Sequence, residues 1–394
     1  MKKFFAIILA VCLLFTGFLT WKNASEKKAA EESTDINELL AQLEAEQGSQ
    51  SYIDFEAMYK LHAPDEVVLT VGSNEVTWDQ LFYYIYSNIN YVSQMFSYYG
   101  SGVDWSMPVD EEGTKTVSAA MTDMAAENIQ QMIAATRFAE AEGVDLTAEQ
   151  EAELQEYIQS NVTAACGEGA TEEDFNEYLK SIYVPRSLFD TMMRWNYLDT
   201  NCFEKLYGAN GANISDEDAM AFVDEAGYMW ANHILFMCMD AEGNALDDAA
   251  KAEKLTQAQA LAEELRACKD NDELLALFAQ RKQELDEDTG KTYYPDGYIF
   301  TMSDSYVQEF KDTANALSLY EVSDPVETSY GYHVMLRLPI TPDTVIDESY
   351  GTTARQAVAE KRYNEDIVAY MNTLEVKFAD GFEPVKVEDF IREA

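Results

Sequence analysis

Hydrophobic positions recur at helical spacing through most of residues 51–228, after one strand-like run at residues 67–71. That run is β-branched and is followed by a turn at residues 72–74, so it predicts a short strand. Residues 77–80 have the form of a capping box that opens a helix over residues 78–99, with aromatic side chains on more than one face. Such a helix is either enclosed by the core or lines a groove. Further helices are expected over residues 115–142 and from Thr147, Thr171, Pro185 and Ser215 onward.

The pattern changes at Tyr228 from helical to alternating, which marks the start of a different segment. Strands are expected at residues 229–237, 298–300, 326–328 and 332–338, and helices at residues 248–268, 272–283 and 306–317. This order predicts an α+β domain with an antiparallel sheet over residues 229–339. A helix at 349–374 and a strand at 374–378 follow, and like the strand at 67–71 they lack nearby partners. We therefore expect residues 51–228 and 340–394 to fold together as a mainly helical domain, into which the α+β domain is inserted.

The N-terminus has the features of a targeting segment. Lys2 and Lys3 precede an apolar run that extends to Trp21, the arrangement of a secretory signal peptide or of a membrane anchor. The sequence leaves cleavage of residues 1–21 open, because the residues near Ala24 form a poor cleavage site and Cys12 lies in the middle of the run. Residues 22–50 are polar and charged and are expected to be a linker. Both alternatives place the rest of the chain outside the cytoplasm.

Charge and cysteine content restrict the possible partners and chemistry. Among the 394 residues, Asp and Glu number 72 and Lys and Arg number 27, which gives a net charge of −45. Phosphate groups are repelled by such a chain, so nucleic acid is not an expected partner, whereas basic clients are attracted. The three histidines limit any His-based metal site, and the sequence contains no H-E-x-x-H or EF-hand motif, so no metal is expected. Isolated thiols are expected, although the sequence cannot choose among the three disulfide pairings open to Cys166, Cys202, Cys238 and Cys268.

Two of the three histidines, His233 and His333, lie in the middle of predicted strands at the two ends of the α+β segment. If these strands pair, the two imidazoles meet at the centre of the sheet. The pattern leaves two alternatives open: a pair of core histidines with no further task, or a functional imidazole pair.

The residues around these histidines favour the functional alternative. Five short blocks resemble, in order and spacing, the A-x-H-I-L, F-A, F-x-x-A-x-x-A-L, E-V-S-x-P-V and G-Y-H-I-I blocks of the parvulin family of peptidyl-prolyl isomerases. The blocks in this chain are residues 231–236, 278–279, 310–317, 321–326 and 331–335. Together with the secretory N-terminus and the helical flanks, they make the chain similar to extracytoplasmic foldases of the SurA/PrsA type.

The resemblance implies a chaperone-like helical domain and a peptidyl-prolyl isomerase that twists X–Pro amides without a covalent step or a cofactor. Its partners would be unfolded or proline-containing secreted polypeptides, and the N-terminal segment would provide membrane attachment. His233 and His333 would form the catalytic pair, with Asp288 facing the amide and Thr328 hydrogen-bonded to the histidines. The substrate-binding residues would be Phe310, Tyr306, Leu235 and Tyr298.

The sequence also departs from the parvulin pattern. Asp296 takes the place of an apolar residue of the proline-binding cup, Tyr306 stands near the usual Met, and Tyr320 replaces a common turn Gly. These departures predict weak isomerase activity with chaperoning dominant. They also motivate an alternative function, that of a non-catalytic holdase or adaptor that retains the parvulin fold.

Overall fold

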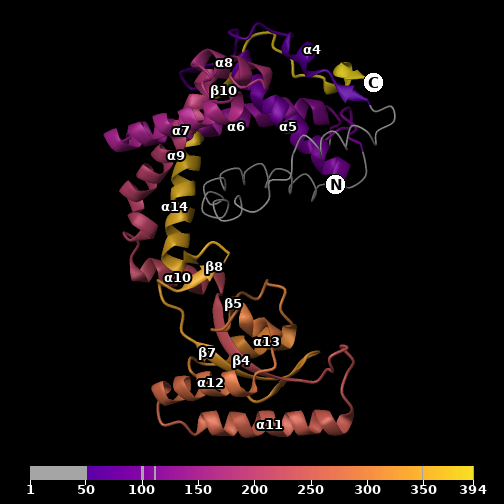
Figure 1. Ribbon diagram of the computed structural model, residues 1–394, viewed down its shortest axis with the longest axis vertical. Coiled ribbons are helices and arrows are strands. Elements are labelled where there is room, and N and C mark those ends of the chain that lie inside the picture. The colour runs from indigo at the N-terminus through magenta and orange to yellow at the C-terminus, as the bar shows by residue number, and fades with distance from the viewer. Residues whose placement is uncertain (1–50, 99–101, 111, 348, 394) are drawn as a thin grey trace. The chain divides into compact units, whose positions relative to one another are not determined.

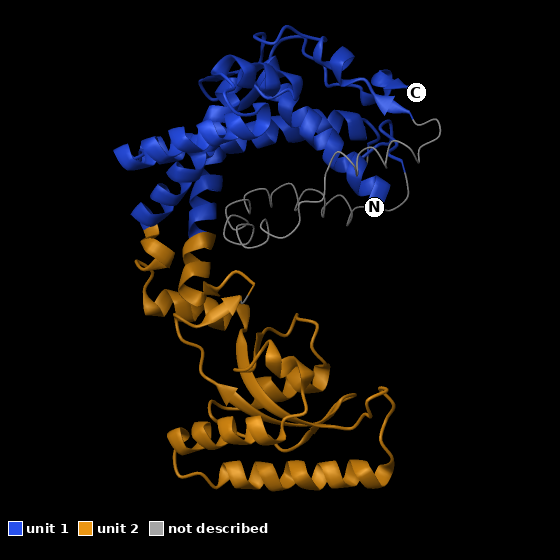
Figure 2. Ribbon diagram, viewed as in Figure 1, with its two compact units in different colours: residues 1–206, 362–394 blue, residues 207–361 orange. Residues whose placement is uncertain are grey.

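The structure is a computed structural model that describes residues 51–98, 102–110, 112–347 and 349–393. The described chain divides into two compact units: residues up to 206 together with residues from 362 onward form unit 1, and residues 207–361 form unit 2 (Figure 2). The predicted signal or anchor at residues 1–21 and the predicted linker at residues 22–50 lie outside the described residues. Within the described ranges, no helix is both long enough and apolar enough to cross a membrane.

Unit 1 contains a three-stranded antiparallel sheet to which both ends of the chain contribute. Its strands, in spatial order, are β10 (Val376–Phe378), β2 (Val67–Val71) and β3 (Asn74–Thr77). The expectation of a lone strand at residues 67–71 is wrong in one respect, since β2 forms a hairpin with β3. The sequence pattern missed β3 because Val76 is its only apolar residue. A second strand pair, β1 (Tyr52–Ile53) with β11 (Ile391–Arg392), also joins the chain ends.

The core of unit 1 lies between α5 (Trp78–Tyr98) and α6 (Val117–Ala141). Trp78 and Phe82 of α5 are fully buried there, so the aromatic helix is enclosed for most of its length. The other described elements of unit 1 are α4 (Phe55–Tyr59), α7 (Ala148–Cys166), α8 (Glu172–Ser181), α9 (Arg186–Tyr207, up to residue 206), α14 (Ala354–Met371, from residue 362) and the short helix η4 (Val387–Phe390).

Helix starts that the sequence predicts are confirmed by their caps. The hydroxyl of Thr147 accepts a hydrogen bond from the N–H of Gln150 at 3.2 Å, and the side chain of Gln150 accepts one from the N–H of Thr147 at 2.9 Å. Thr171 caps α8 in the same way with Asp174, and Ser215 caps α10 (Asp216–Ala226). Each cap satisfies a backbone N–H that the helix itself leaves unpaired, a contribution of about 1 kcal/mol.

The main sheet of unit 2 has four antiparallel strands in the order β5 (Tyr298–Phe300), β4 (Met229–Met237), β7 (Gly331–Leu338) and β6 (Val326–Glu327). One face is covered by α11 (Asp248–Arg266) and α12 (Asn271–Leu285), and α13 (Gln308–Ala316) lies on the other face (Figure 1). Ile234 and Val334 point to the α11–α12 face, whereas Ala231 and Met335 point to the α13 face. The mixed α+β class that the sequence predicts is confirmed.

The remaining elements of unit 2 are α10, the first part of α14, the strand pair β8 (Val345–Asp347) with β9 (Thr352–Thr353), and the short helices η2 (Ala209–Gly211) and η3 (Thr289–Thr292). Arg355 on α14 forms ion pairs with Asp216 of α10 at 2.5 Å and with Asp343 at 2.9 Å. The predicted isolated thiols are confirmed: Cys166, Cys202, Cys238 and Cys268 are all free.

Candidate active site

The register between β4 and β7 brings the two strand histidines to one face of the sheet. Leu235 lies directly opposite His333, and His233 lies directly opposite Met335. Because side chains alternate along a strand, these four residues share the α13 face, and the two imidazoles are diagonal neighbours. Their ring centroids are 4.9 Å apart, and both residues are almost completely buried. The two rings therefore meet, as pairing of their strands predicts.

Thr328 orients the second imidazole. Its hydroxyl oxygen lies 2.8 Å from Nε2 of His333 and accepts a hydrogen bond from the N–H of Tyr330 at 3.2 Å. Burial, followed by the nearby His233, lowers the pKa of His333 to about 3, so this ring is neutral at pH 7. When the Thr328 hydroxyl donates to Nε2, the proton of the neutral ring resides on Nδ1.

Asp288 places a negative charge beside the first imidazole. Its Oδ2 lies 3.4 Å from Nε2 of His233 and accepts a hydrogen bond from the Tyr298 hydroxyl at 2.9 Å. Its Oδ1 accepts one from the N–H of Gly290 at 2.9 Å. The His233 imidazole, then the Gly290 N–H and the Tyr298 hydroxyl, hold the pKa of Asp288 well below its usual range, so the carboxylate is ionised at pH 7. Burial and the bond to Asp288 raise the pKa of Tyr298, which keeps the phenol a donor.

Asp286 attaches the segment that carries Asp288 to the free edge of β4. Its Oδ1 accepts hydrogen bonds from the N–H groups of Leu235 at 2.9 Å and of Asp288 at 3.1 Å. The N–H of Glu287 in turn donates to the carbonyl of Leu235 at 3.0 Å. β5 pairs with β4 only over residues 229–231 of β4. Residues 286–287 take the place of β5 further along the same edge of β4, at Leu235. Asp286, a buried residue, therefore fixes the position of Asp288.

Sequence reasoning missed Asp286. It belongs to the acidic run at residues 284–288, and such runs are typical of solvated surface. The signal available in the sequence was the spacing of Asp286 and Asp288, two residues apart, which places both side chains on one side of an extended segment.

An aromatic cluster surrounds the imidazole pair. Phe310 of α13 makes edge contacts with His233 and His333, at ring-centroid distances of 5.3 and 5.6 Å. Tyr298 of β5 stacks on His233 at 5.6 Å, with ring planes 16° apart. Tyr306 contacts Tyr298 at 5.4 Å and joins the same cluster. These rings give the two buried imidazoles apolar surroundings and limit their contact with water.

Three ring nitrogens of the pair are buried without a hydrogen-bond partner among the described residues: Nδ1 and Nε2 of His233 and Nδ1 of His333. The 3.4 Å contact between His233 and Asp288 is long for a hydrogen bond. Each unpaired buried polar group costs about 1–3 kcal/mol. A pair of satisfied core histidines does not fit this geometry, and unpaired polar atoms of this kind are typical of functional sites.

Asp296, which the sequence places in the proline-binding cup, lies elsewhere, so that interpretation is wrong. Its side chain is exposed, and its carbonyl accepts a hydrogen bond at 2.9 Å from the indole of Trp230, which packs on the α11–α12 face. The cause is the tight turn at Gly297, where φ is +93° and a Cβ would come within 2.6 Å of the Ala231 carbonyl oxygen. Tyr306, the other departure, does join the aromatic cluster.

Comparison with known protein families agrees with this geometry. The family described as "Rotamase: PPIC-type PPIASE domain" matches residues 233–338, from the first histidine of the pair to the end of β7. These residues therefore match the parvulin-type domain family, and the resemblance found in the sequence is confirmed.

Two curated relatives match part of the chain. Foldase protein PrsA 1 of Bacillus cereus is 32% identical over 115 residues, which cover 28% of this chain and 38% of the relative. Chaperone SurA of Shewanella denitrificans is 25% identical over 108 residues, which cover 27% of this chain and 25% of the relative. The chain thus matches less than half the length of either relative. The crystal structure of PrsA from Bacillus subtilis aligns with 79% of this chain and 92% of its own at 15% identity, with a TM-score of 0.24.

Proposed function

We propose that this protein is a peptidyl-prolyl cis–trans isomerase and folding chaperone for secreted polypeptides outside the cytoplasmic membrane. The observation that carries the proposal is the buried pair of His233 and His333, 4.9 Å apart, with Thr328 on one ring and the ionised Asp288 beside the other. The parvulin-type match and the similarity to a foldase and to a chaperone support both activities. The location rests on the signal-like residues 1–21, which would attach the protein to the membrane if they stay uncleaved.

The reaction requires a site that binds the twisted X–Pro amide better than either planar form. Amide resonance creates a barrier of about 18–20 kcal/mol, although the trans form is favoured by only about 0.5–1 kcal/mol. Twisting removes this resonance, so negative charge leaves the carbonyl oxygen and the lone pair returns to nitrogen. A fixed carboxylate such as Asp288 repels the oxygen of a planar amide more strongly than the oxygen of a twisted amide. Because the surroundings are aromatic, this repulsion is only weakly screened. No covalent intermediate is needed.

An isomerisation assay with a proline-containing peptide tests the catalytic part of the proposal. His233→Ala and His333→Ala are each expected to lower kcat/KM at least about tenfold, or about 1.4 kcal/mol of transition-state stabilisation. His62→Ala is the matched control, because this third histidine lies in unit 1, where it pairs with Glu66. If both site variants remain folded by circular dichroism and catalyse at the wild-type rate, the catalytic proposal is refuted.

The alternative, a non-catalytic holdase or adaptor, has one observation in its favour. Tyr298 stacks on His233 and is itself contacted by Tyr306, so the protein's own side chains cover the first imidazole. This function predicts that aggregation of an unfolded client is suppressed while the isomerisation rate stays unchanged. Running the aggregation and isomerisation assays on the same preparation separates the two functions.

A further inference from the structure

A groove of about 390 Å³ within unit 1 is formed by residues of α5, α7, α8 and α9 and by the turn between α8 and α9. No charged side chain lines it. Ala165 of α7 is exposed in the groove, Met192 and Met193 of α9 are half-buried, and 40% of Tyr178 of α8 is exposed. A volume of this size is within the usual range of ligand sites, and flexible methionine side chains adapt to varied apolar groups.

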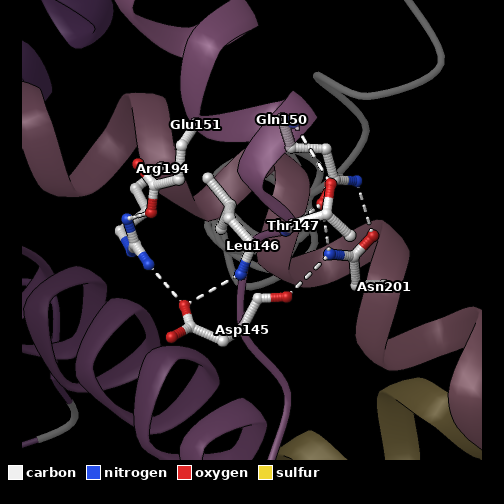
Figure 3. Close-up of polar contacts among 7 residues, drawn as sticks. All are labelled: Asp145, Leu146, Thr147, Gln150, Glu151, Arg194 and Asn201. Atoms are coloured by element: carbon white, nitrogen blue, oxygen red, sulfur yellow. Dashed lines mark hydrogen bonds and ion pairs between the residues drawn. The ribbon is translucent and has the colours of Figure 1, made fainter.

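Polar contacts fix two walls of the groove, α7 and α9, relative to each other (Figure 3). Arg194 of α9 forms an ion pair with Glu151 of α7 at 2.5 Å and another with Asp145, which precedes α7. Asn201 of α9 exchanges side-chain hydrogen bonds with Gln150 of α7 at 2.8 and 2.9 Å. One exposed ion pair contributes little, but a network of this kind holds the two helices in one arrangement.

The third wall, α8, is anchored through the turn that follows it. Tyr183 in this turn has a φ of +58°, which is uncommon for a residue other than glycine. Its ring packs against Tyr59, Phe82 and Tyr86 of the unit 1 core, at centroid distances of 5.3, 5.1 and 5.2 Å. The groove is therefore preformed, and a ligand does not have to order its walls.

The helices that form the groove carry a strong excess of negative charge. Residues 148–193 contain ten acidic and two basic residues. Both basic residues are already paired, Lys180 with Glu177 at 2.6 Å and Arg186 with Asp190 at 2.8 Å and with Glu172. The uncharged groove thus lies among helices whose unpaired charges are acidic, and these attract a cationic ligand.

We propose that this groove binds a short extended segment of an unfolded polypeptide, with large apolar side chains in the groove and Lys or Arg flanking them. The apolar lining favours the large apolar side chains of the peptide, and the acidic helices attract the Lys or Arg residues that flank them. The proposal rests on the chaperone part of the proposed function and does not involve proline.

Fluorescence anisotropy of the full-length protein with labelled, proline-free peptides tests this site. The probe is a short peptide with two Leu and one Phe flanked by Lys, and its control has Glu in place of each Lys. Ala165→Trp fills the groove from an exposed helix position, and Ala152→Trp, exposed elsewhere on α7, is the matched control. We expect the Lys peptide to bind at least about tenfold more tightly than the Glu peptide, with a difference that salt reduces. Ala165→Trp is expected to weaken binding at least about tenfold, and Ala152→Trp to leave it unchanged.

Three outcomes overturn the proposal. Equal affinity of the wild type and Ala165→Trp for the Lys peptide excludes the groove, and equal affinity for the Lys and Glu peptides excludes the charge selection. If the wild type sediments as a dimer and Ala165→Trp as a monomer, the groove binds a second copy of the chain instead. The chaperone function is judged separately by aggregation of reduced, unfolded lysozyme. If the wild type suppresses it while the groove result is negative, only the groove proposal fails.

Discussion

Asp286 offers the sharpest test of how this site is built, because its two hydrogen bonds are independent of any assumption about substrate. Asp286→Ala leaves the N–H groups of Leu235 and Asp288 without an acceptor. An unpaired buried donor costs about 1–3 kcal/mol. Leu235 is buried and Asp288 only half-buried, so water compensates part of the second loss. We therefore expect the free energy of unfolding of unit 2 to fall by about 2–4 kcal/mol.

Hydrogen exchange in urea, followed by mass spectrometry of peptides from β4, measures this loss where it occurs. Asp286→Asn keeps an oxygen acceptor and is expected to cost less than about 1.5 kcal/mol. Glu263→Ala, an exposed acidic position on α11, is the control for removing one negative charge. If Asp286→Ala costs no more than Glu263→Ala, or Asp286→Asn costs as much as Asp286→Ala, the acceptor role is refuted.

Two further predictions concern the second imidazole. Thr328→Val removes the hydroxyl that lies 2.8 Å from Nε2 of His333. We expect it to lower the free energy of urea unfolding by about 1–2 kcal/mol and to lower kcat/KM, whereas Thr328→Ser keeps the hydroxyl and should retain the wild-type stability and kcat/KM. Identical stability and kcat/KM of the two variants would contradict the role of the hydroxyl. The pKa of His333 in the folded protein is about 3, below the ordinary value of about 6.5. As the pH falls from 6.5 toward 3, the unfolded chain therefore takes up a proton that the folded protein does not. The free energy of unfolding falls over this range by up to about 1.4 kcal/mol per pH unit. Asp288, whose pKa is also lowered, adds a loss in the same direction only below about pH 4. Burial raises the pKa of Asp199 in unit 1 to about 6, so that group titrates in the same interval with the opposite effect on stability. The contribution of His333 is therefore read from the variant: the free energy of urea unfolding at pH 7 minus that at pH 5 should be lower in His333→Gln than in the wild type.

Much of the fold followed from periodicity and capping residues. The alternation around His233 and His333 predicted the strands that become β4 and β7, and Thr147 and Thr171 predicted the starts of α7 and α8. The limits of the compact units were not visible, because the division at residues 361 and 362 falls inside α14. A continuous helix shows no break in composition at such a point.

The site itself was predictable only in part. Thr328 and Asp288 came from resemblance to a family, and the structure places both beside the histidines. The burial of Asp286 depends on where β5 ends, and the position of Asp296 depends on the turn at Gly297. Both are tertiary effects that local patterns do not encode.

Tyr298 connects the two candidate functions. Its hydroxyl holds the carboxylate of Asp288 at 2.9 Å while its ring covers His233. A peptide that displaces this ring therefore also breaks a hydrogen bond to a charged group, which is worth about 1.5–3 kcal/mol. An X–Pro amide has no N–H to donate to Asp288, so it does not recover this free energy, and the cost falls on substrate binding more than on the twist itself. If the proposed function holds, we expect this site to bind short peptides weakly and to depend on a chaperone surface of the same chain that holds the client.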